Sequence, residues 1–121
     1  MMPGSGDSSV IDLVTHDPRT DEVVLVISQM EPWGAKGERL PDLQDKLRAY
    51  LLFVEGGQLA RTYPHMAGKR VRFRLDCVGS PGATDREFLK RVREVWLAPA
   101  GFRLEVREYP EHLLGHELDA M

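Results

Sequence analysis

The chain has 121 residues, of which 42% are hydrophobic and 29% charged, and its formal net charge is −3. This length and composition are typical of one globular domain that can bury a core without disulfide bonds or metals. The mild negative charge excludes a general electrostatic pull toward nucleic acid. Cys77 is the only cysteine, which rules out an intramolecular disulfide and fits a reducing cytoplasm.

The two ends of the chain differ in composition from its middle. Residues 1–9 are rich in Gly and Ser and lack the apolar segment of a signal peptide, so we expect a flexible tail there. No apolar run approaches the roughly 18 residues of a membrane span. We therefore expect a cytoplasmic protein with a single α+β domain over residues 10–109 and a C-terminal tail over residues 110–121.

The predicted domain begins with a hairpin. β-Branched residues predict a strand over Val10–Thr15, and a nearly all-apolar run predicts a second strand over Glu22–Ser28. The second strand should be central, with both faces partly covered. Between the strands, Pro18 fixes φ and Asp17 can bond the following backbone, which is typical of a turn.

Two helices are predicted after the hairpin. The first opens at Leu40-Pro41 and stops at Gly56-Gly57, and Gln58–Tyr63 can add a short helical turn. The second opens with a capping box in which Thr84 is the N-cap and Glu87 the N3 residue. Their apolar stripes are Leu43, Leu47, Tyr50, Leu51 and Val54 in the first helix and Phe88, Val92, Val95 and Trp96 in the second.

Two further strands alternate cleanly between apolar and polar residues. In Arg70–Val78 the inward set is Val71, Phe73, Leu75 and Cys77, whereas in Phe102–Arg107 it is Phe102, Leu104 and Val106. We expect Cys77 to be a small core hydrophobe rather than a reactive thiol.

The element order ββαβαβ predicts an α+β, two-layer sandwich. Its four-stranded mixed sheet should have the order 1-2-3-4, with two helices on one face; a ferredoxin-like strand order is the alternative. The other face should be open, because strands covered on both sides would not place arginines on one of them. We interpret this face as a candidate docking surface. It is made of Arg70, Arg72, Arg74, Arg103, Arg107, Val24 and Val26, and Val14 is expected beside them. The alternative is a solvated face on which Asp76 and Glu105 pair across strands.

Two other groups of residues are candidates for a catalytic site and a metal site. Trp33, Tyr63 and His65 are a candidate pocket for acid–base chemistry, although the sequence places no nucleophile or second carboxylate beside them. His112 and His116 have the spacing of zinc ligands on a helix, but they lack the remaining ligands of a known motif. We expect no metal and no cofactor.

Several short segments carry a resemblance to a known family. They are Asp17-Pro18-Arg19-Thr20, Trp33, Leu43-Gln44-Asp45-Lys46, Tyr50-Leu51, Phe53, Tyr63-Pro64, Gly68 and Ala100-Gly101-Phe102. In these the chain resembles a bacterial family of small uncharacterised proteins, domain of unknown function 6572. It differs in its longer tails and in Pro99. The resemblance implies the fold and a bacterial source, and it implies no activity.

The leading functional hypothesis is a non-enzymatic interaction module. It would dock a protein partner, or a second copy of itself as a homodimer, on the open sheet face. One alternative is a nucleic-acid-binding module that uses the arginines of that face, which is disfavoured because Phe73 and Phe102 point inward and cannot stack on bases. The other alternative is a small enzyme with a site near Tyr63 and His65.

Overall fold

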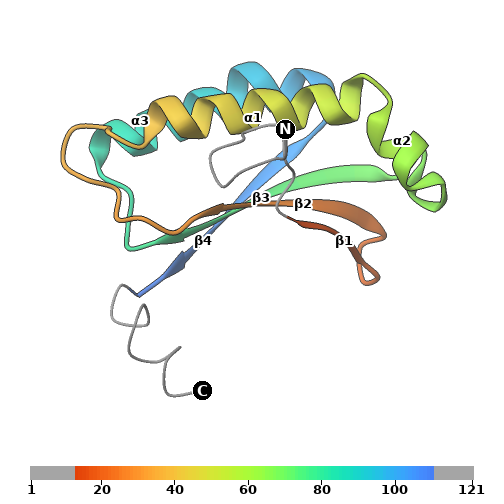
Figure 1. Ribbon diagram of the computed structural model, residues 1–121, viewed down its shortest axis with the longest axis horizontal. Helices are drawn as coiled ribbons and strands as arrows, with labels where there is room; N and C mark the ends of the chain where they lie inside the picture. Colours follow the sequence, from red (N-terminus) through yellow and green to blue (C-terminus); the bar gives the residue numbers. More distant parts are fainter. Residues whose placement is uncertain (1–12, 111–121) are drawn as a thin grey trace, which may run out of the picture.

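The computed structural model describes residues 13–110, which form a four-stranded sheet with helices packed on one face (Figure 1). The elements are β1 (Leu13–Asp17), β2 (Glu22–Gln29), α1 (Leu40–Glu55), α2 (Gln58–Thr62), η1 (Pro64–Met66), β3 (Arg70–Val78), α3 (Ala83–Arg91), η2 (Val92–Leu97), η3 (Ala98–Ala100) and β4 (Arg103–Tyr109).

The strand order in the sheet is β1-β2-β3-β4. β1 runs antiparallel to β2, and β3 and β4 run parallel to β2. The predicted α+β class and strand order are therefore confirmed, and the ferredoxin-like order is not adopted. The strand β3 has its predicted bounds, whereas β1, β2 and β4 extend one or two residues beyond their predicted C-terminal ends, because the ladders continue through Asp17, Gln29 and Tyr109.

The core lies between the sheet and the helix layer (Figure 1). Val71, Phe73, Leu75 and Cys77 of β3 are all at most 4% exposed and meet Leu43, Leu47 and Tyr50 of α1 in one cluster. The Tyr50 hydroxyl donates a hydrogen bond to the carbonyl of Val26, which ties α1 directly to β2. The alternation of β3 thus separates a fully apolar face from a polar one, as its sequence predicts.

The turn between β1 and β2 is held by backbone and side-chain bonds. The Asp21 N–H donates to the carbonyl of Asp17, and the Arg19 N–H donates to the Asp17 carboxylate. Asp21 has a φ of +59°, a left-handed conformation that Asp tolerates better than most residues. This four-residue turn sets Asp17 opposite Glu22 in the ladder, so both carboxylates emerge on the same sheet face.

The second long helix begins two residues earlier than the capping box predicted. Gly82, not Thr84, is the N-cap, and the Asp85 carboxylate accepts the Gly82 N–H at 3.1 Å. Asp85 is only 2% exposed, whereas Thr84 and Glu87 are exposed. The prediction of a Thr84 cap was wrong because Asp85, two residues before Glu87, supplies the N3 carboxylate of the capping box.

After Arg91 the helix continues as the π-helical segment η2. The wider turn changes which side chains face the sheet: Leu97 is fully buried, whereas Val95 is 61% exposed. The prediction that Val95 lies on the buried stripe was therefore wrong, because a π turn adds a residue and shifts the 3.6-residue phase. Pro99 and Gly101 then end the helical run as expected, with Gly101 at a φ of +82°.

The side chain of Arg93 also contacts the sheet. Its Nε and Nη2 lie 3.4 Å from the carbonyl oxygen of Leu104 and donate to it. Because β4 is an edge strand of the sheet, this carbonyl would otherwise be left without a strand partner.

Candidate functional site

The sheet face opposite the helices has a defined composition, because ladder partners share a face. In strand order its residues are Leu13, Thr15 and Asp17, then Glu22, Val24, Val26 and Ser28, then Arg70, Arg72, Arg74, Asp76 and Val78, then Arg103, Glu105, Arg107 and Tyr109. Val14 is opposite Leu25 and packs on the core, so its predicted place beside the arginines was wrong. Here we call this side the open face.

The two valines predicted as apolar contacts on this face are not accessible. Val24 and Val26 lie on the open face by register, between β1 and β3, yet they are only 2% and 3% exposed. Their cross-strand neighbours on β3 are Arg72 and Arg74, whose long aliphatic stems can lie against apolar surface. The two valines of the predicted docking surface therefore cannot contact a partner, and only its charged residues remain accessible.

The arginines are paired with carboxylates rather than forming a purely basic surface. Arg74 donates to both oxygens of Asp76 on its own strand. Arg72 is 12% exposed at its side chain and contacts three carboxylates, those of Asp17, Glu22 and Glu105. Of the cross-strand pairs expected for Asp76 and Glu105, only that of Glu105 with Arg72 forms among residues 13–110; Asp76 pairs within its own strand.

Near the β1–β2 turn these pairs join into one group, the arginine–carboxylate cluster: Asp17, Glu22, Arg72, Arg103, Glu105 and Arg107. Glu22 Oε1 accepts from Arg72 Nη1 at 2.7 Å and also from Arg103 Nη2. Arg72 Nη2 is 3.0 Å from Asp17 Oδ2, and Arg107 Nε is 2.9 Å from Glu105 Oε2. Glu22, whose side chain is 4% exposed, lies at the centre and connects three strands.

The cluster keeps its carboxylates ionised. The Arg103 guanidinium holds the pKa of Glu22 below its usual range, against the opposing effect of burial. Arg72 does the same for the pKa of Asp17, and Arg107 for the pKa of Glu105. Because these pKa values are lowered, none of the three groups is suited to donate a proton near neutral pH.

The guanidiniums at the rim of the cluster keep unused donors. Arg103 and Arg107 have side chains 62% and 46% exposed, and each guanidinium has five N–H donors. With Arg19 and Thr20 of the turn, they line a hollow of about 290 Å³. Within residues 13–110 the exposed Arg19 guanidinium has no hydrogen-bond or ion-pair partner. Buried Glu22 therefore fixes cationic groups around a small depression.

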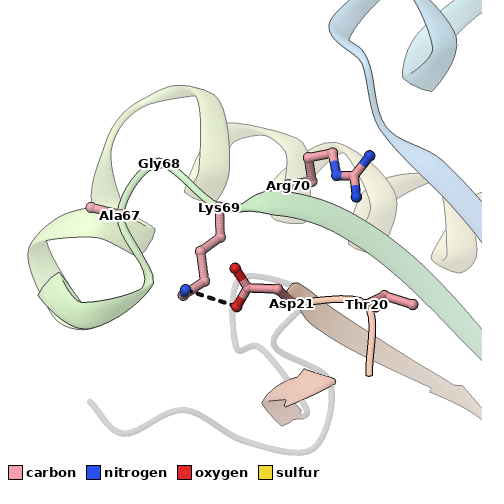
Figure 2. A pocket seen from close by; sticks show the side chains of 6 residues that line it. All are labelled: Thr20, Asp21, Ala67, Gly68, Lys69 and Arg70. Atoms are coloured by element: carbon pink, nitrogen blue, oxygen red, sulfur yellow. Dashed lines mark hydrogen bonds and ion pairs between the residues drawn. The ribbon is translucent and has the colours of Figure 1, made fainter. Parts of the chain in front are cut away.

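A second hollow of about 410 Å³ lies on the other side of the same turn (Figure 2). Thr20 and Asp21 line it from the turn, and Ala67, Gly68, Lys69 and Arg70 line it from the start of β3. Asp21 Oδ1 accepts from Lys69 Nζ and from His16 Nε2, both at 2.8 Å. Lys69, and then His16, hold the pKa of Asp21 below its usual range. Figure 2 shows the ion pair between Lys69 and Asp21, and the guanidinium of Arg70 points away from this pair.

The predicted pocket of Trp33, Tyr63 and His65 is not assembled. Tyr63 and His65 precede β3 and meet edge to face, with ring centroids 6.3 Å apart. Trp33 is 4% exposed and lies beside Cys77, near the opposite end of β3. Cys77 is seven positions along β3 from Arg70, which corresponds to roughly 23 Å. Trp33 belongs to the core, and the three residues do not share a site.

Other candidate chemistry finds little support within the described residues. Burial raises the pKa of the Cys77 thiol to about 11, so this side chain is protonated and enclosed. Residues 13–110 contain no group of three His, Cys, Asp or Glu side chains placed to hold a metal. His112 and His116 lie outside the described residues. In that same part of the chain, none of the helices is long and apolar enough to cross a bilayer.

Sequence reasoning missed the carboxylates that organise the cluster. The sequence pattern marks Glu22 only as the first residue of an apolar strand, and Asp17 only as a turn residue. Their partners Arg72 and Arg103 are 50 to 81 positions away in the chain. The sequence does contain a sign that these two carboxylates lie together, because a hairpin closed by a short turn places Asp17 and Glu22 on one face.

Comparison with known protein families gives a match over most of the chain. A family described as "Family of unknown function (DUF6572)" matches residues 5–109. No curated protein and no solved structure shows significant similarity to the chain.

Proposed function

We propose a binding role for this chain, which belongs to DUF6572, a family of unknown function: it is a non-enzymatic protein-interaction module. In this proposal a protein partner docks on the open face at the arginine–carboxylate cluster. The observation that carries it is the pair of exposed guanidiniums, Arg103 and Arg107, held in place by Glu22 and Glu105. Arginines fixed before binding lose less conformational freedom when a partner arrives.

The partner should present acidic side chains. Arg103 and Arg107 already use one donor group each on internal carboxylates, and the remaining N–H donors point to a planar anionic acceptor such as a carboxylate. Arginine is also among the residue types enriched at protein interfaces. The lowered pKa values of Asp17, Glu22 and Glu105 support binding rather than acid catalysis, because these groups stay charged and paired.

A cross-linking experiment identifies the partner and the face together. A photoreactive phenylalanine analogue replaces Leu13, which is 49% exposed on the open face, or Leu52, which is 65% exposed on α1. We expect a discrete protein adduct from position 13 and none from position 52. Adducts from position 52 alone would place the interface on the helix layer and overturn the proposal.

The identified partner is then purified and its affinity measured by calorimetry. Arg103→Glu with Arg107→Glu should weaken binding at least about tenfold, because it reverses two interface charges. The matched control is Arg86→Glu with Lys90→Glu, two exposed residues of α3, which gives the same change in net charge. Equal affinities for the two double variants would contradict docking at the cluster. Steeply salt-dependent binding of an oligonucleotide to the same residues would instead favour the nucleic-acid alternative.

A further inference from the structure

The two hollows beside the β1–β2 turn share a wall. Thr20 lines both, with the Arg19 hollow on one side and the Arg70 hollow on the other. Their volumes, about 290 and 410 Å³, suit one or two side chains each. They are at the small end of the range that holds a whole small-molecule ligand. Together they make a two-part depression that follows the turn.

Each hollow is lined by one arginine that has no partner among residues 13–110. Lys69, Arg72, Arg103 and Arg107 are all paired with carboxylates. Within residues 13–110, Arg19 and Arg70 are exposed and have neither a hydrogen bond nor an ion pair at the guanidinium. Among the cations that line these two hollows, the two without a described partner thus lie one in each hollow, and Thr20 lines both.

The charge balance of the two hollows is the same. Around the first, the four arginines that line it face three carboxylates, Asp17 and Glu105 at its wall and Glu22 beneath them. The second is lined by two cationic side chains, Lys69 and Arg70, and by one carboxylate, that of Asp21. Each hollow therefore has one net positive charge. A single carboxylate neutralises such a site, whereas a phosphate monoester, with nearly two negative charges near pH 7, would leave an excess in either one.

We infer that the turn recognises a diacidic segment of a protein partner, with one carboxylate on Arg19 and the other on Arg70. The inference rests on the proposed function and names the chemistry of its ligand. In an extended segment, two acidic residues separated by one residue project to the same side, about 7 Å apart. Such a pair can present one carboxylate to each side of Thr20, which lines both hollows. A nucleic-acid backbone also carries single charges, but Phe73 is fully buried and cannot offer a stacking surface.

The test uses the full chain and four short peptides. The probe is the capped peptide Gly-Ser-Glu-Ser-Glu-Ser-Gly, compared with versions in which the first, the second or both Glu are replaced by Gln. Binding is followed at low ionic strength by ¹⁵N–¹H chemical-shift titration of the protein. We expect shifts at Arg19, Thr20 and Arg70, and a Kd about threefold weaker for each Glu lost, as for exposed ion pairs.

Protein variants assign each carboxylate to its arginine. In Arg19→Gln, loss of one Glu should no longer change the affinity, while loss of the other still does; Arg70→Gln should show the reverse. Arg86→Gln is the control and should bind as the wild type does. Because Arg19 and Arg70 have no described partners, both variants should keep the wild-type Tm. Equal affinity for the diacidic and single-acid peptides, or tighter binding of an octathymidylate at the same salt, would overturn the inference.

The outcomes separate this inference from the proposed function. A partner that depends on Arg103 and Arg107 but not on Arg19 or Arg70 would keep the docking proposal and remove the diacidic one. If the diacidic peptide binds more weakly to both single variants and position 13 gives no protein adduct, recognition of acidic residues at the turn would stand and docking of a protein on the arginine–carboxylate cluster would be removed.

Discussion

Arg103, the first residue of β4, reaches across β3 and donates a hydrogen bond to Glu22, the first residue of β2. The pair joins two strands that do not touch in the sheet, and the carboxylate involved is among the least exposed charged groups of the described chain. The open face is therefore held together by charge at its turn end, while the opposite face is held by apolar packing.

Removing the Glu22 carboxylate should destabilise the fold. Glu22→Ala leaves Arg72 and Arg103 without their shared acceptor, and we expect the free energy of unfolding to fall by about 3 kcal/mol. Urea denaturation followed by tryptophan fluorescence measures the change. Glu55→Ala, at an exposed position with no described partner, should stay within about 0.5 kcal/mol of the wild type. Similar decreases in the free energy of unfolding for both variants would show that Glu22 is not central to the stability of the fold.

The contribution of Glu22 should depend on pH in one direction. Its pKa is lower in the folded state than in the unfolded chain, so its stabilising effect is complete above the unfolded pKa of about 4.3. The effect is lost as pH falls through the lower folded pKa. The stability difference between wild type and Glu22→Gln should thus be constant from pH 7 to 5 and shrink below about pH 4. A difference that grows on acidification would contradict the lowered pKa.

The π-helical segment gives a prediction about two neighbouring residues. Leu97 is fully buried and Val95 is 61% exposed. Leu97→Ala should lower the free energy of unfolding by about 3 kcal/mol, since it empties a core position. Val95→Ala should change it by less than about 0.5 kcal/mol. Thermal and urea unfolding of both variants test the segment, because a regular α-helix would reverse the order of the two effects.

Cys77 should resist modification while the protein is folded. Burial raises the pKa of its thiol to about 11, and the thiolate is the reactive form. At pH 8 a disulfide reagent such as dithionitrobenzoate should react with Cys77 only as fast as the protein opens, and rapidly in urea. Free glutathione provides the intrinsic rate. Complete labelling of the folded protein within seconds would show an accessible thiol and contradict the core position.

The sequence carried more information about the sheet than about its charges. Alternation in Arg70–Val78 was enough to assign the two faces, since side-chain direction in a strand has a period of two. The pairing of Arg72 with Asp17, Glu22 and Glu105 was not predicted, because it depends on which strands become neighbours. Val95 was misplaced for a different reason, since nothing local in Val92–Leu97 announces a π turn.

The candidate site was predicted in part. Its face was named correctly, and Arg103 and Arg107 are exposed on it. Val24 and Val26 were expected to be accessible and are buried, because the long side chains of Arg72 and Arg74 lie beside them on β3. Arg19 was noticed only as a turn residue, although an unpaired arginine at a turn tip is visible in the sequence once the hairpin is assumed.

The bond from Arg93 to the Leu104 carbonyl bears on how the protein behaves at high concentration. It occupies an acceptor on the outer side of β4, where an extended segment of another molecule would otherwise add as a fifth strand. The other edge strand, β1, has the exposed Leu13 at its first described residue. Growth of ordered aggregates should therefore begin at β1, and Arg93→Ala should open a second site of growth at β4.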